Sequence, residues 1–387
     1  MEDWQHGGFG LYLHWPFCAS KCPYCDFNSH VRDRVDQAVW QDALLSEIDR
    51  VGRETKDRVL DTVFFGGGTP SLMDPDLVAA LMDRIRATWR ISNSFETTLE
   101  ANPSSVEAGR FRAYRDAGVN RVSMGVQALN DRDLRALGRL HSVAEARAAF
   151  DIARGCFDRV SFDLIYARQD QALSEWEAEL NEALHMAVDH LSLYQLTIEP
   201  GTAFGARAAI GRLSGLPGED LGADMYERTQ EICAAAGMPA YEVSNHARTE
   251  AQSRHNQIYW RYGDYGGIGP GAHGRLSLAD GKWATSTHLS PEAWLSAVQG
   301  NGNGEVPRTV IPQADQADEL LMMGLRLHEG VSLSRYEALA GRSLPAAALE
   351  ELITTGLLDL DGSRLRATSS GMMVLNAVLR QLLLSEA

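Results

Sequence analysis

Three of the five cysteines in this chain lie close together, as Cys18, Cys22 and Cys25 in the spacing C-x-x-x-C-x-x-C. A 4Fe–4S cluster is normally held by four cysteine thiolates. Three clustered thiolates therefore predict a cluster in which one iron stays open to a small ligand. A structural zinc site is the alternative, but zinc usually takes four protein ligands. The nearest downstream donor, His30, has no convincing spacing, so the pattern favours the cluster.

The overall composition predicts a cytoplasmic globular protein. The 387 residues are 44% hydrophobic, which is enough for one large domain and one small domain. No apolar run reaches the roughly 18 residues of a membrane span, and the first residues lack the basic and apolar parts of an export signal. The odd number of cysteines, three of them clustered, argues against a disulfide framework and for a reducing compartment.

The chain is acidic, with 36 basic and 52 acidic residues and a formal net charge of −16. Such a balance disfavours nonspecific attraction to nucleic acid or to anionic lipid. It weakens the hypothesis of an enzyme that acts on RNA, and we predict no nucleic-acid partner.

Apolar runs and amphipathic segments alternate along the first 236 residues. Strands are predicted at 9–14, 62–65, 96–101, 121–126, 160–166 and 190–197, and helices at 36–53, 74–89, 105–117, 131–137, 143–154, 173–186 and 219–236. Repeated βα units imply a parallel sheet, either a barrel or a doubly wound sheet. Six units rather than eight favour an α/β fold with an incomplete (β/α)6 barrel. Functional side chains then lie at the carboxyl ends of strands, where the chain has Glu100, Asn102, Gln127, Asp163 and Gln195.

The last part of the chain predicts a separate small α+β domain. Residues 301–305 form a Gly/Asn-rich linker. Helices are predicted at 315–327, 334–340, 345–355 and 370–384, with a hairpin at 357–360 and 364–367 before the last helix. This order is winged-helix-like, but the segment is not basic, so we interpret it as a lid or docking domain. The predicted domains are therefore 1–300 and 301–387.

A glycine-rich turn and several strand-end polar residues are further candidates for ligand binding. The run Gly66-Gly-Gly-Thr-Pro70 directly follows a predicted strand, and glycines let a backbone approach a ligand closely. It lacks the Lys-Ser/Thr pair of a P-loop. Arg139 joins Glu100, Gln127 and Asp163 as polar residues at or just past strand ends. These four are either ordinary solvated or paired groups, or ligands for the polar parts of a cofactor.

The motif His255-Asn-x-x-Tyr-Trp allows three interpretations. The histidine is a hydrogen-bonded structural residue, a general acid or base, or an axial ligand of heme iron. His14 and His273 leave the same alternatives open. Cys156 and Cys233 fall on apolar helix faces and are predicted to be buried without a role in chemistry.

Taken together, the motifs resemble the radical S-adenosylmethionine (SAM) superfamily and, within it, the oxygen-independent coproporphyrinogen III oxidase family. The shared segments are Tyr12-Leu-His-Trp-Pro-Phe-Cys18, Cys22-Pro-Tyr-Cys-Asp-Phe-Asn-Ser-His30, Gly66-Gly-Gly-Thr-Pro70, Glu100-Ala-Asn-Pro103, Gly125-Val-Gln127 and Ser161-Phe-Asp-Leu-Ile-Tyr166. The resemblance implies that Cys18, Cys22 and Cys25 hold the cluster and that SAM chelates its open iron. It also implies a SAM site lined by Tyr12, Phe27, Gly68, Thr69, Glu100, Gln127, Arg139, Asp163 and Ala272.

The family has two branches, and the motifs here resemble the HemW branch. The oxidase branch has a fourth cysteine where this chain has Phe27, and a long N-terminal extension that is absent here. The HemW branch has C-x-x-x-C-x-x-C-x-F and H-N-x-x-Y-W, and both are present. This resemblance implies a heme chaperone with a 4Fe–4S cluster, SAM and heme, in which His255 is the heme ligand and respiratory enzymes receive the heme. An electron donor for the cluster is a further predicted partner, while membrane-surface docking and a homodimer stay open.

The alternative function is an enzyme of porphyrin biosynthesis, an oxygen-independent coproporphyrinogen III dehydrogenase. Such an enzyme binds a substrate with four carboxylates, and the sequence offers no obvious arginine cluster for it. One departure from the family pattern bears on both functions, the heme chaperone and the dehydrogenase. The family usually has Gly-Leu/Arg-Pro-Gly-Gln after the fifth strand, where this chain has Ala167-Arg168-Gln169-Asp170-Gln171. We expect the loss of glycine and proline to change the backbone of this loop at the mouth of the site.

Overall fold

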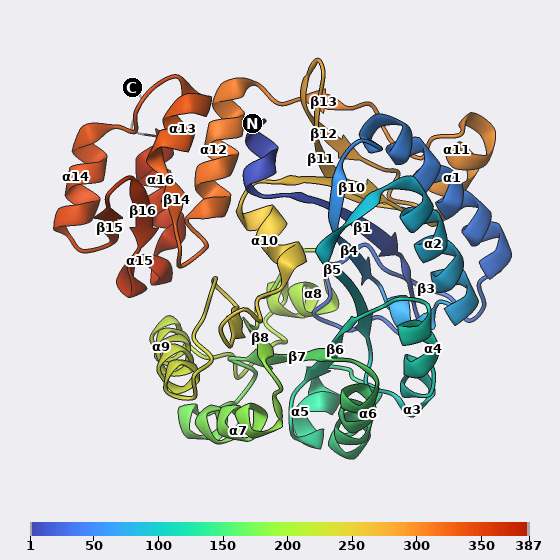
Figure 1. Ribbon diagram of the computed structural model, residues 1–387. Helices are drawn as coiled ribbons and strands as arrows, with labels where there is room; N and C mark the ends of the chain where they lie inside the picture. Colours follow the sequence, from blue (N-terminus) through green and yellow to red (C-terminus); the bar gives the residue numbers. More distant parts are fainter. Residues whose placement is uncertain (1, 385–387) are drawn as a thin grey trace.

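The protein is an α/β structure built on one large mixed sheet, with a small module at its C-terminal end (Figure 1). The computed structural model describes residues 2–384, apart from the side chains of residues 105 and 106. None of the helices in this described part is long and apolar enough to cross a lipid bilayer.

Six parallel strands form the centre of the sheet, and each pairs with the next one along the chain. They are β1 (Phe9–Trp15), β4 (Val59–Gly67), β5 (Arg90–Ala101), β6 (Arg121–Gln127), β7 (Arg159–Tyr166) and β8 (His190–Gln195). The six predicted strands are therefore confirmed. The main error was at the start of β5, which is six residues longer than predicted. Its first residues are mostly polar and exposed, so they show no clear apolar pattern.

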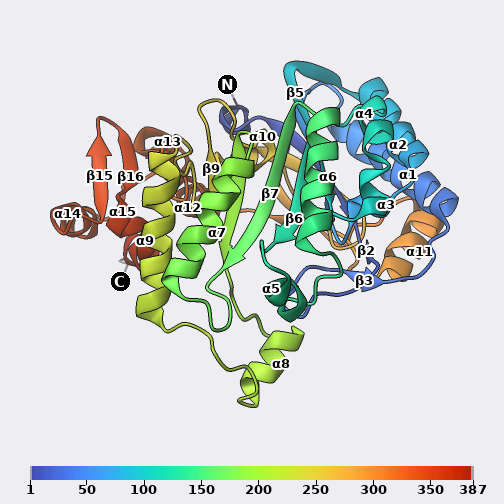
Figure 2. The same cartoon turned by 90° about the horizontal axis from the view of Figure 1, so that it is seen from below.

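Helices cover the outer face of this sheet and bury an apolar core against it. They are α1 (Gln37–Thr55), α2 (Pro75–Thr88), α3 (Ser105–Ala108), α4 (Phe111–Asp116), α6 (Val143–Cys156), α7 (Leu173–Met186) and α9 (Glu219–Ala235). Two further helices, α5 (Asp131–Ala136) and α8 (Ala203–Ala209), share a smaller apolar cluster that contains Leu134 and Phe204. Figure 2 shows α6 and α7 lying along the outside of β6 and β7. Helices α3 and α4 replace one predicted helix, since Gly109 interrupts it. Phe65, Phe162, Ile48, Phe150 and Trp176 are among the fully buried core residues.

Five further strands extend the sheet at its two sides, and the sequence did not predict them. They are β9 (Asn245–Ala247), β10 (Asp264–Ile268), β11 (His273–Leu278), β12 (Gly281–Ser286) and β13 (Thr309–Val310). The strand order is β13-β12-β11-β10-β1-β4-β5-β6-β7-β8-β9, so the sheet has two separate edges and the predicted incomplete barrel is confirmed. Gly266 and Gly267 hide the strand pattern of β10. A Cβ at Gly267 would lie 2.2 Å from the carbonyl oxygen of His273, so this close pairing needs glycine.

The C-terminal module has its own sheet and its own apolar core. Its elements are α12 (Gln313–Gly324), β14 (Val331–Ser332), α13 (Leu333–Ala340), α14 (Ala346–Thr354), β15 (Leu358–Asp361), β16 (Arg364–Ala367), α15 (Ser369–Met373) and α16 (Leu375–Leu384). The three strands pair in the order β14-β16-β15. This arrangement confirms the winged-helix-like prediction and adds β14, while the predicted last helix is two helices. The domain division at residue 300 stays a prediction.

Candidate cluster and cofactor site

A cavity of about 730 Å³ opens at the carboxyl ends of the central strands. Ten residues singled out in the sequence line it: Cys18, Cys22, Cys25, Phe27, Gly68, Thr69, Glu100, Gln127, Arg139 and Asp163. Tyr12, Ala272 and His255 do not line this cavity. The parallel strands bring together residues that are far apart in the chain, because their carboxyl ends share one edge of the barrel.

The three cysteines lie on a loop that begins at β2 (Phe17–Cys18) and ends at β3 (His30–Val31), which pair with each other. All three thiols are free, and Cys18 is buried while the other two are partly exposed. Each sulfur has a neighbouring polar group. The Thr69 hydroxyl donates to the Cys18 Sγ at 3.4 Å and Arg139 Nη1 donates to the Cys22 Sγ at 3.3 Å. The Ser29 Oγ lies 3.9 Å from the Cys25 Sγ.

This donor set fits an iron–sulfur cluster. Among residues 2–384, no group of three or more His, Cys, Asp or Glu side chains is arranged to hold a single metal ion. The three thiols instead surround a shared cavity. Burial raises the pKa of the Cys18 and Cys25 thiols, and hydrogen bonds to the sulfurs are the usual means by which a protein tunes a cluster.

The glycine turn after β4 approaches the cysteine loop so closely that side chains are excluded. A Cβ at Gly68 would lie 2.8 Å from the carbonyl oxygen of Phe17. The backbone N–H groups here are already used: Gly67 donates to Glu100 Oε2 at 3.1 Å, Gly68 to the Trp15 carbonyl at 2.7 Å and Thr69 to the Phe17 carbonyl at 2.9 Å. The turn therefore offers a ligand its carbonyl oxygens, which suit a donor such as an ammonium group.

Two carboxylates face the cavity from neighbouring parts of the sheet. Burial, together with the nearby Asp163 charge, raises the pKa of Glu100 to about 8. Burial raises the pKa of Asp163 to about 6, although the Ser123 hydroxyl donates to it at 3.4 Å. Two acids held this way gain most from a ligand that brings positive charge or hydroxyl donors. The ammonium, sulfonium and ribose hydroxyls of SAM have this chemistry.

Arg139 ties the cysteine loop to the strand ends. Its Nη2 donates to Asn102 Oδ1 at 2.6 Å and to the Gly125 carbonyl at 2.7 Å. Its Nε is buried and has no hydrogen-bond partner among the described residues. Asn102, one of the polar residues predicted at the strand ends, also donates to the Thr69 hydroxyl at 3.3 Å.

Tyr12 and Ala272 have other partners in the structure. The Tyr12 hydroxyl is 3.0 Å from His14 Nδ1, and its ring lies 6.5 Å from the ring of His255. Ala272 is buried, and its backbone N–H donates to the Thr287 hydroxyl at 2.9 Å. The role of these two residues in SAM binding stays a prediction.

His255 is buried on α10 (Arg254–Trp260), and both nitrogens of its ring have partners. Its Nδ1 lies 2.7 Å from the Thr62 hydroxyl and its Nε2 lies 2.6 Å from the Tyr259 hydroxyl. Burial lowers the pKa of His255 to about 3, so the ring is neutral. For His255 to bind a heme iron, one of the two hydrogen bonds must break.

The loop after β7 contains no glycine, but two of its residues have the left-handed backbone conformation that glycine usually adopts. Ala167 has φ of 57° and Asp170 has φ of 55°, both left-handed. Between them Arg168 is buried and bridges Asp133 at 2.8 Å and Glu179 at 2.5 Å. These two positions correspond to the family glycines, and the expected change of the loop backbone stays a prediction.

Comparison with known proteins agrees with this geometry. Residues 12–182 match the Radical SAM superfamily, and residues 311–374 match the HemN C-terminal domain. The heme chaperone HemW of Escherichia coli is 37% identical over 381 residues, covering 97% of this chain and 98% of HemW. The chain belongs to the HemW branch of the radical SAM superfamily.

Other members of this family resemble the chain to a similar degree. The HemW of Mycobacterium tuberculosis H37Rv is 36% identical, with 97% of this chain and 95% of that protein covered. A zebrafish (Danio rerio) relative, "Radical S-adenosyl methionine domain-containing protein 1, mitochondrial", is 37% identical over 97% of this chain and 86% of its own length. The solved structure of coproporphyrinogen III oxidase (HemN) from Escherichia coli has the same fold, with a TM-score of 0.81 and 22% identity over 98% of this chain and 92% of HemN.

Proposed function

We propose that this member of the HemW family is a heme chaperone, which carries a 4Fe–4S cluster and SAM and passes heme to heme-dependent respiratory enzymes. The observation that carries the proposal is the near-complete alignment with bacterial proteins named heme chaperone, at 35–37% identity. The cavity with three free thiols supports the cofactor part of the proposal.

Cys18, Cys22 and Cys25 would hold the cluster, and Thr69, Ser29 and Arg139 would stabilise their thiolate sulfurs. When bound together, the cluster and SAM supply a one-electron route to an adenosyl radical. Glu100 and Asp163 would accept hydrogen bonds from cationic and hydroxyl groups of SAM, and Arg139 would pair with its carboxylate. The remaining residues proposed to bind SAM are Tyr12, Phe27, Gly68, Thr69, Gln127 and Ala272.

His255 is proposed as the heme ligand on the strength of its motif alone. His255→Ala then abolishes the Soret band of hemin-loaded protein and leaves the cluster absorbance unchanged. Tyr259→Phe is the matched variant, because it frees His255 Nε2 without removing the ring. Undiminished heme binding by His255→Ala would show that another group binds the iron.

The deciding experiment separates the chaperone from the oxidase alternative. Cluster-reconstituted protein is incubated without oxygen with coproporphyrinogen III, SAM and a strong reductant, and both tetrapyrroles and 5′-deoxyadenosine are followed. The chaperone proposal expects no decarboxylated product, together with transfer of bound heme to an apo-enzyme. Formation of protoporphyrinogen overturns the proposal in favour of the dehydrogenase.

We further propose that the protein works in the cytoplasm with an electron donor for its cluster. Five cysteines without a disulfide suit a reducing compartment, and the net charge of −16 argues against a nucleic-acid partner. Peripheral docking at a membrane and a homodimer stay predictions.

A further inference from the structure

Hydrogen bonds connect the Arg139 side chain to two of the three clustered cysteines. The first connection is direct, because Arg139 Nη1 donates to the Cys22 Sγ at 3.3 Å. The second runs through Asn102, whose Oδ1 accepts from Arg139 Nη2 at 2.6 Å and whose Nδ2 donates to the Thr69 hydroxyl at 3.3 Å. That hydroxyl in turn donates to the Cys18 Sγ at 3.4 Å. We call this second connection the Asn102 relay.

The guanidinium group sets the direction of every bond in the Asn102 relay. Because a guanidinium only donates, the oxygen of the Asn102 amide has to face Arg139. The amide nitrogen then faces Thr69, and since an NH2 group also only donates, the Thr69 hydroxyl accepts from it. The single proton of this hydroxyl is left for the Cys18 sulfur. The amide of Asn102 therefore decides where the Thr69 proton points.

The backbone of Asn102 is held by bonds that do not involve its amide side chain. The residue follows β5, and its backbone N–H donates to Glu107 Oε2 at 2.9 Å. The buried Glu107 carboxylate also accepts from the hydroxyl of Ser71, two residues after Thr69, and from the Ser104 hydroxyl at 3.1 Å. Glu107 thus ties the end of β5 to the glycine turn. A substitution of the Asn102 side chain leaves these bonds in place.

Donors aimed at the sulfurs favour the reduced form of an iron–sulfur cluster, because reduction adds one negative charge. Hydrogen bonds to the sulfurs are among the features that set the reduction potential of such a cluster. The first donor of the Asn102 relay is a cation, and charge-assisted hydrogen bonds are about twice as strong as neutral ones. Bonds joined in a chain also polarise one another. Cys25 differs, since its partners include the Ser29 hydroxyl at 3.9 Å and the backbone of Phe27, both in the cysteine loop.

We infer that Asn102 is a positioning residue for the cluster, which directs the Thr69 hydroxyl onto the Cys18 sulfur and thereby raises the reduction potential. The inference rests on the cluster part of the proposed function. The role of Asn102 is separate from contact with SAM, because it is exerted through Thr69 on a cluster ligand. Arg139 supplies the positive charge, and the amide carries its effect to the sulfur.

A redox titration of the reconstituted protein without SAM, followed by the EPR signal of the reduced cluster, tests the inference. Iron and sulfide content is measured first, so that only cluster-bearing protein is compared. Asn102→Ala is expected to lower the equilibrium constant for one-electron reduction about tenfold, which is a fall of about 59 mV in the midpoint potential. Thr69→Val, which replaces the hydroxyl by a methyl group, is expected to lower it by a similar amount. A wild-type potential in either variant overturns the inference.

The double variant separates positioning from a general disturbance of the cavity. Because Asn102 acts through Thr69, adding Asn102→Ala to Thr69→Val is expected to change the potential no further. Falls that add in the double variant would mean that Asn102 acts on the cluster independently of Thr69, which overturns the inference.

Asn102→Asp is the second variant, and it keeps the shape of the side chain. An ionised aspartate only accepts hydrogen bonds, so it draws the Thr69 proton away from Cys18 and adds a negative charge. A lower potential is expected here as well, including the case in which Asn102→Ala holds no cluster. An unchanged or raised potential overturns the inference.

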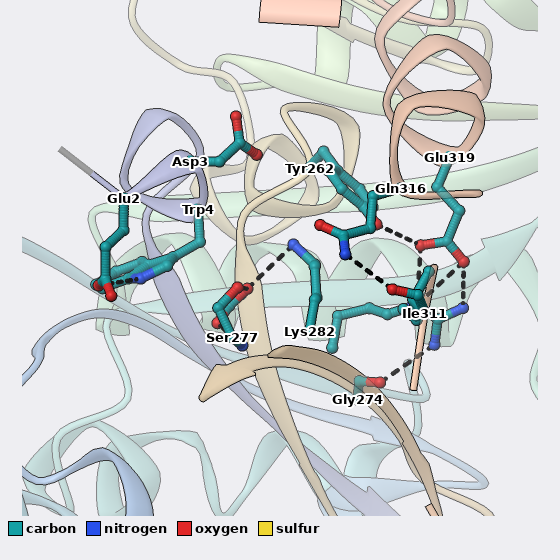
Figure 3. A network of polar contacts seen from close by, with 12 residues as sticks. Glu2, Asp3, Trp4, Tyr262, Gly274, Ser277, Lys282, Ile311, Gln316 and Glu319 are labelled. Atoms are coloured by element: carbon teal, nitrogen blue, oxygen red, sulfur yellow. Dashed lines mark hydrogen bonds and ion pairs between the residues drawn. The ribbon is translucent and has the colours of Figure 1, made fainter. Parts of the chain in front are cut away.

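Arg275→Lys is the matched control, because it changes an arginine in a polar network that does not line the cavity. Arg275 pairs with Glu319 at 2.9 Å, and the Tyr262 hydroxyl donates to the same carboxylate at 2.8 Å. Figure 3 shows Tyr262 and Glu319 pointing toward each other. The control is expected to keep the wild-type potential, and a fall as large as that of Asn102→Ala overturns the inference. Absence of a cluster in the wild-type protein overturns the cluster part of the proposed function instead, so the two failures are distinguishable.

Discussion

The cysteine cavity and a groove beside the C-terminal module are built in different ways. The cavity joins the ends of successive parallel strands and the turns that follow them, with Cys18, Gly68, Glu100 and Asp163 in chain order. The groove, of about 1590 Å³, joins the N-terminal turn η1 (Asp3–His6), the end of α10 and the C-terminal module. A repeated βα unit therefore makes the first site, whereas contact between two separately packed cores makes the second.

The two regions also differ in charge. The cavity holds two carboxyl groups whose pKa values are raised, Glu100 to about 8 and Asp163 to about 6. The groove has three guanidinium groups against two carboxylates. The cavity thus suits a cationic ligand such as SAM, whereas the groove is lined by one more guanidinium group than carboxylates. An acidic chain can keep both environments because they share no lining residue.

The largest expected effect is the loss of the iron–sulfur cluster when one of its three cysteines is replaced. Cys22→Ser should lose the cluster absorbance of the reconstituted protein completely, while its hemin affinity stays within about twofold of wild type because His255, the proposed heme ligand, does not line the cavity. Cys156→Ser, on α6, is the control and should keep the cluster. Full iron and sulfide content in Cys22→Ser would contradict the proposed ligand set, and a parallel loss of hemin would show that the cluster and heme sites are linked.

A second variant contrasts the buried ion pairs of Arg168 with an exposed ion pair. Arg168→Ala leaves Glu179 buried without its cation and leaves Asp133 paired only with Arg132, so it should lower the free energy of unfolding by about 3–5 kcal/mol. Arg147→Ala removes an exposed pair with Glu182 and should cost about 0–1 kcal/mol. Urea denaturation of both variants measures the difference. Similar losses of stability in the two variants would mean that burial does not strengthen the contribution of the Arg168 ion pairs.

Glu100→Gln tests the charge of the cavity through the pH dependence of the apoprotein. Because the pKa of Glu100 is about 8 in the folded state against an ordinary value of 4.5, wild-type stability should fall as pH rises between these values. Removing the acid should reduce this fall by roughly 1–3 kcal/mol, as measured by denaturation at several pH values. Glu227→Gln, at an exposed position of α9, should leave the curve unchanged. If the stability of Glu100→Gln and that of the wild type change with pH in the same way, the Glu100 carboxyl group does not cause the fall in stability.

The smallest expected effect concerns the loop after β7. Ala167 is left-handed, with φ of 57°, so Ala167→Gly should stabilise the protein by about 0.5–1 kcal/mol. Ala148→Gly in the exposed interior of α6 should destabilise it by a similar amount. Thermal unfolding of the pair gives opposite shifts in Tm. Destabilisation by Ala167→Gly would mean that the packing of the buried methyl group outweighs the strain.

Most elements of the barrel could be predicted, because apolar runs and amphipathic helices have periods that local sequence reveals. The same regularity explains why strand-end residues such as Glu100 and Asp163 were selected, since successive parallel strands end at one edge. Strand β10 could not be found this way, because Gly266 and Gly267 interrupt its apolar pattern. Gly267 is required by the close pairing with β11, and Gly266 by its contact with Val51 and Leu11. The left-handed backbone at Ala167 could not be predicted either, because alanine rarely adopts this conformation.

The sequence by itself determined the three-cysteine loop, the glycine turn and the order of the βα units, because each depends on residues close together in the chain. Only the tertiary structure decided that both ring nitrogens of His255 are occupied, by Thr62 and Tyr259. It alone also placed His6 and Arg364, from opposite ends of the chain, on one groove. The physical reason is that hydrogen-bond partners of a buried ring, and surfaces between two cores, are set by packing between distant segments.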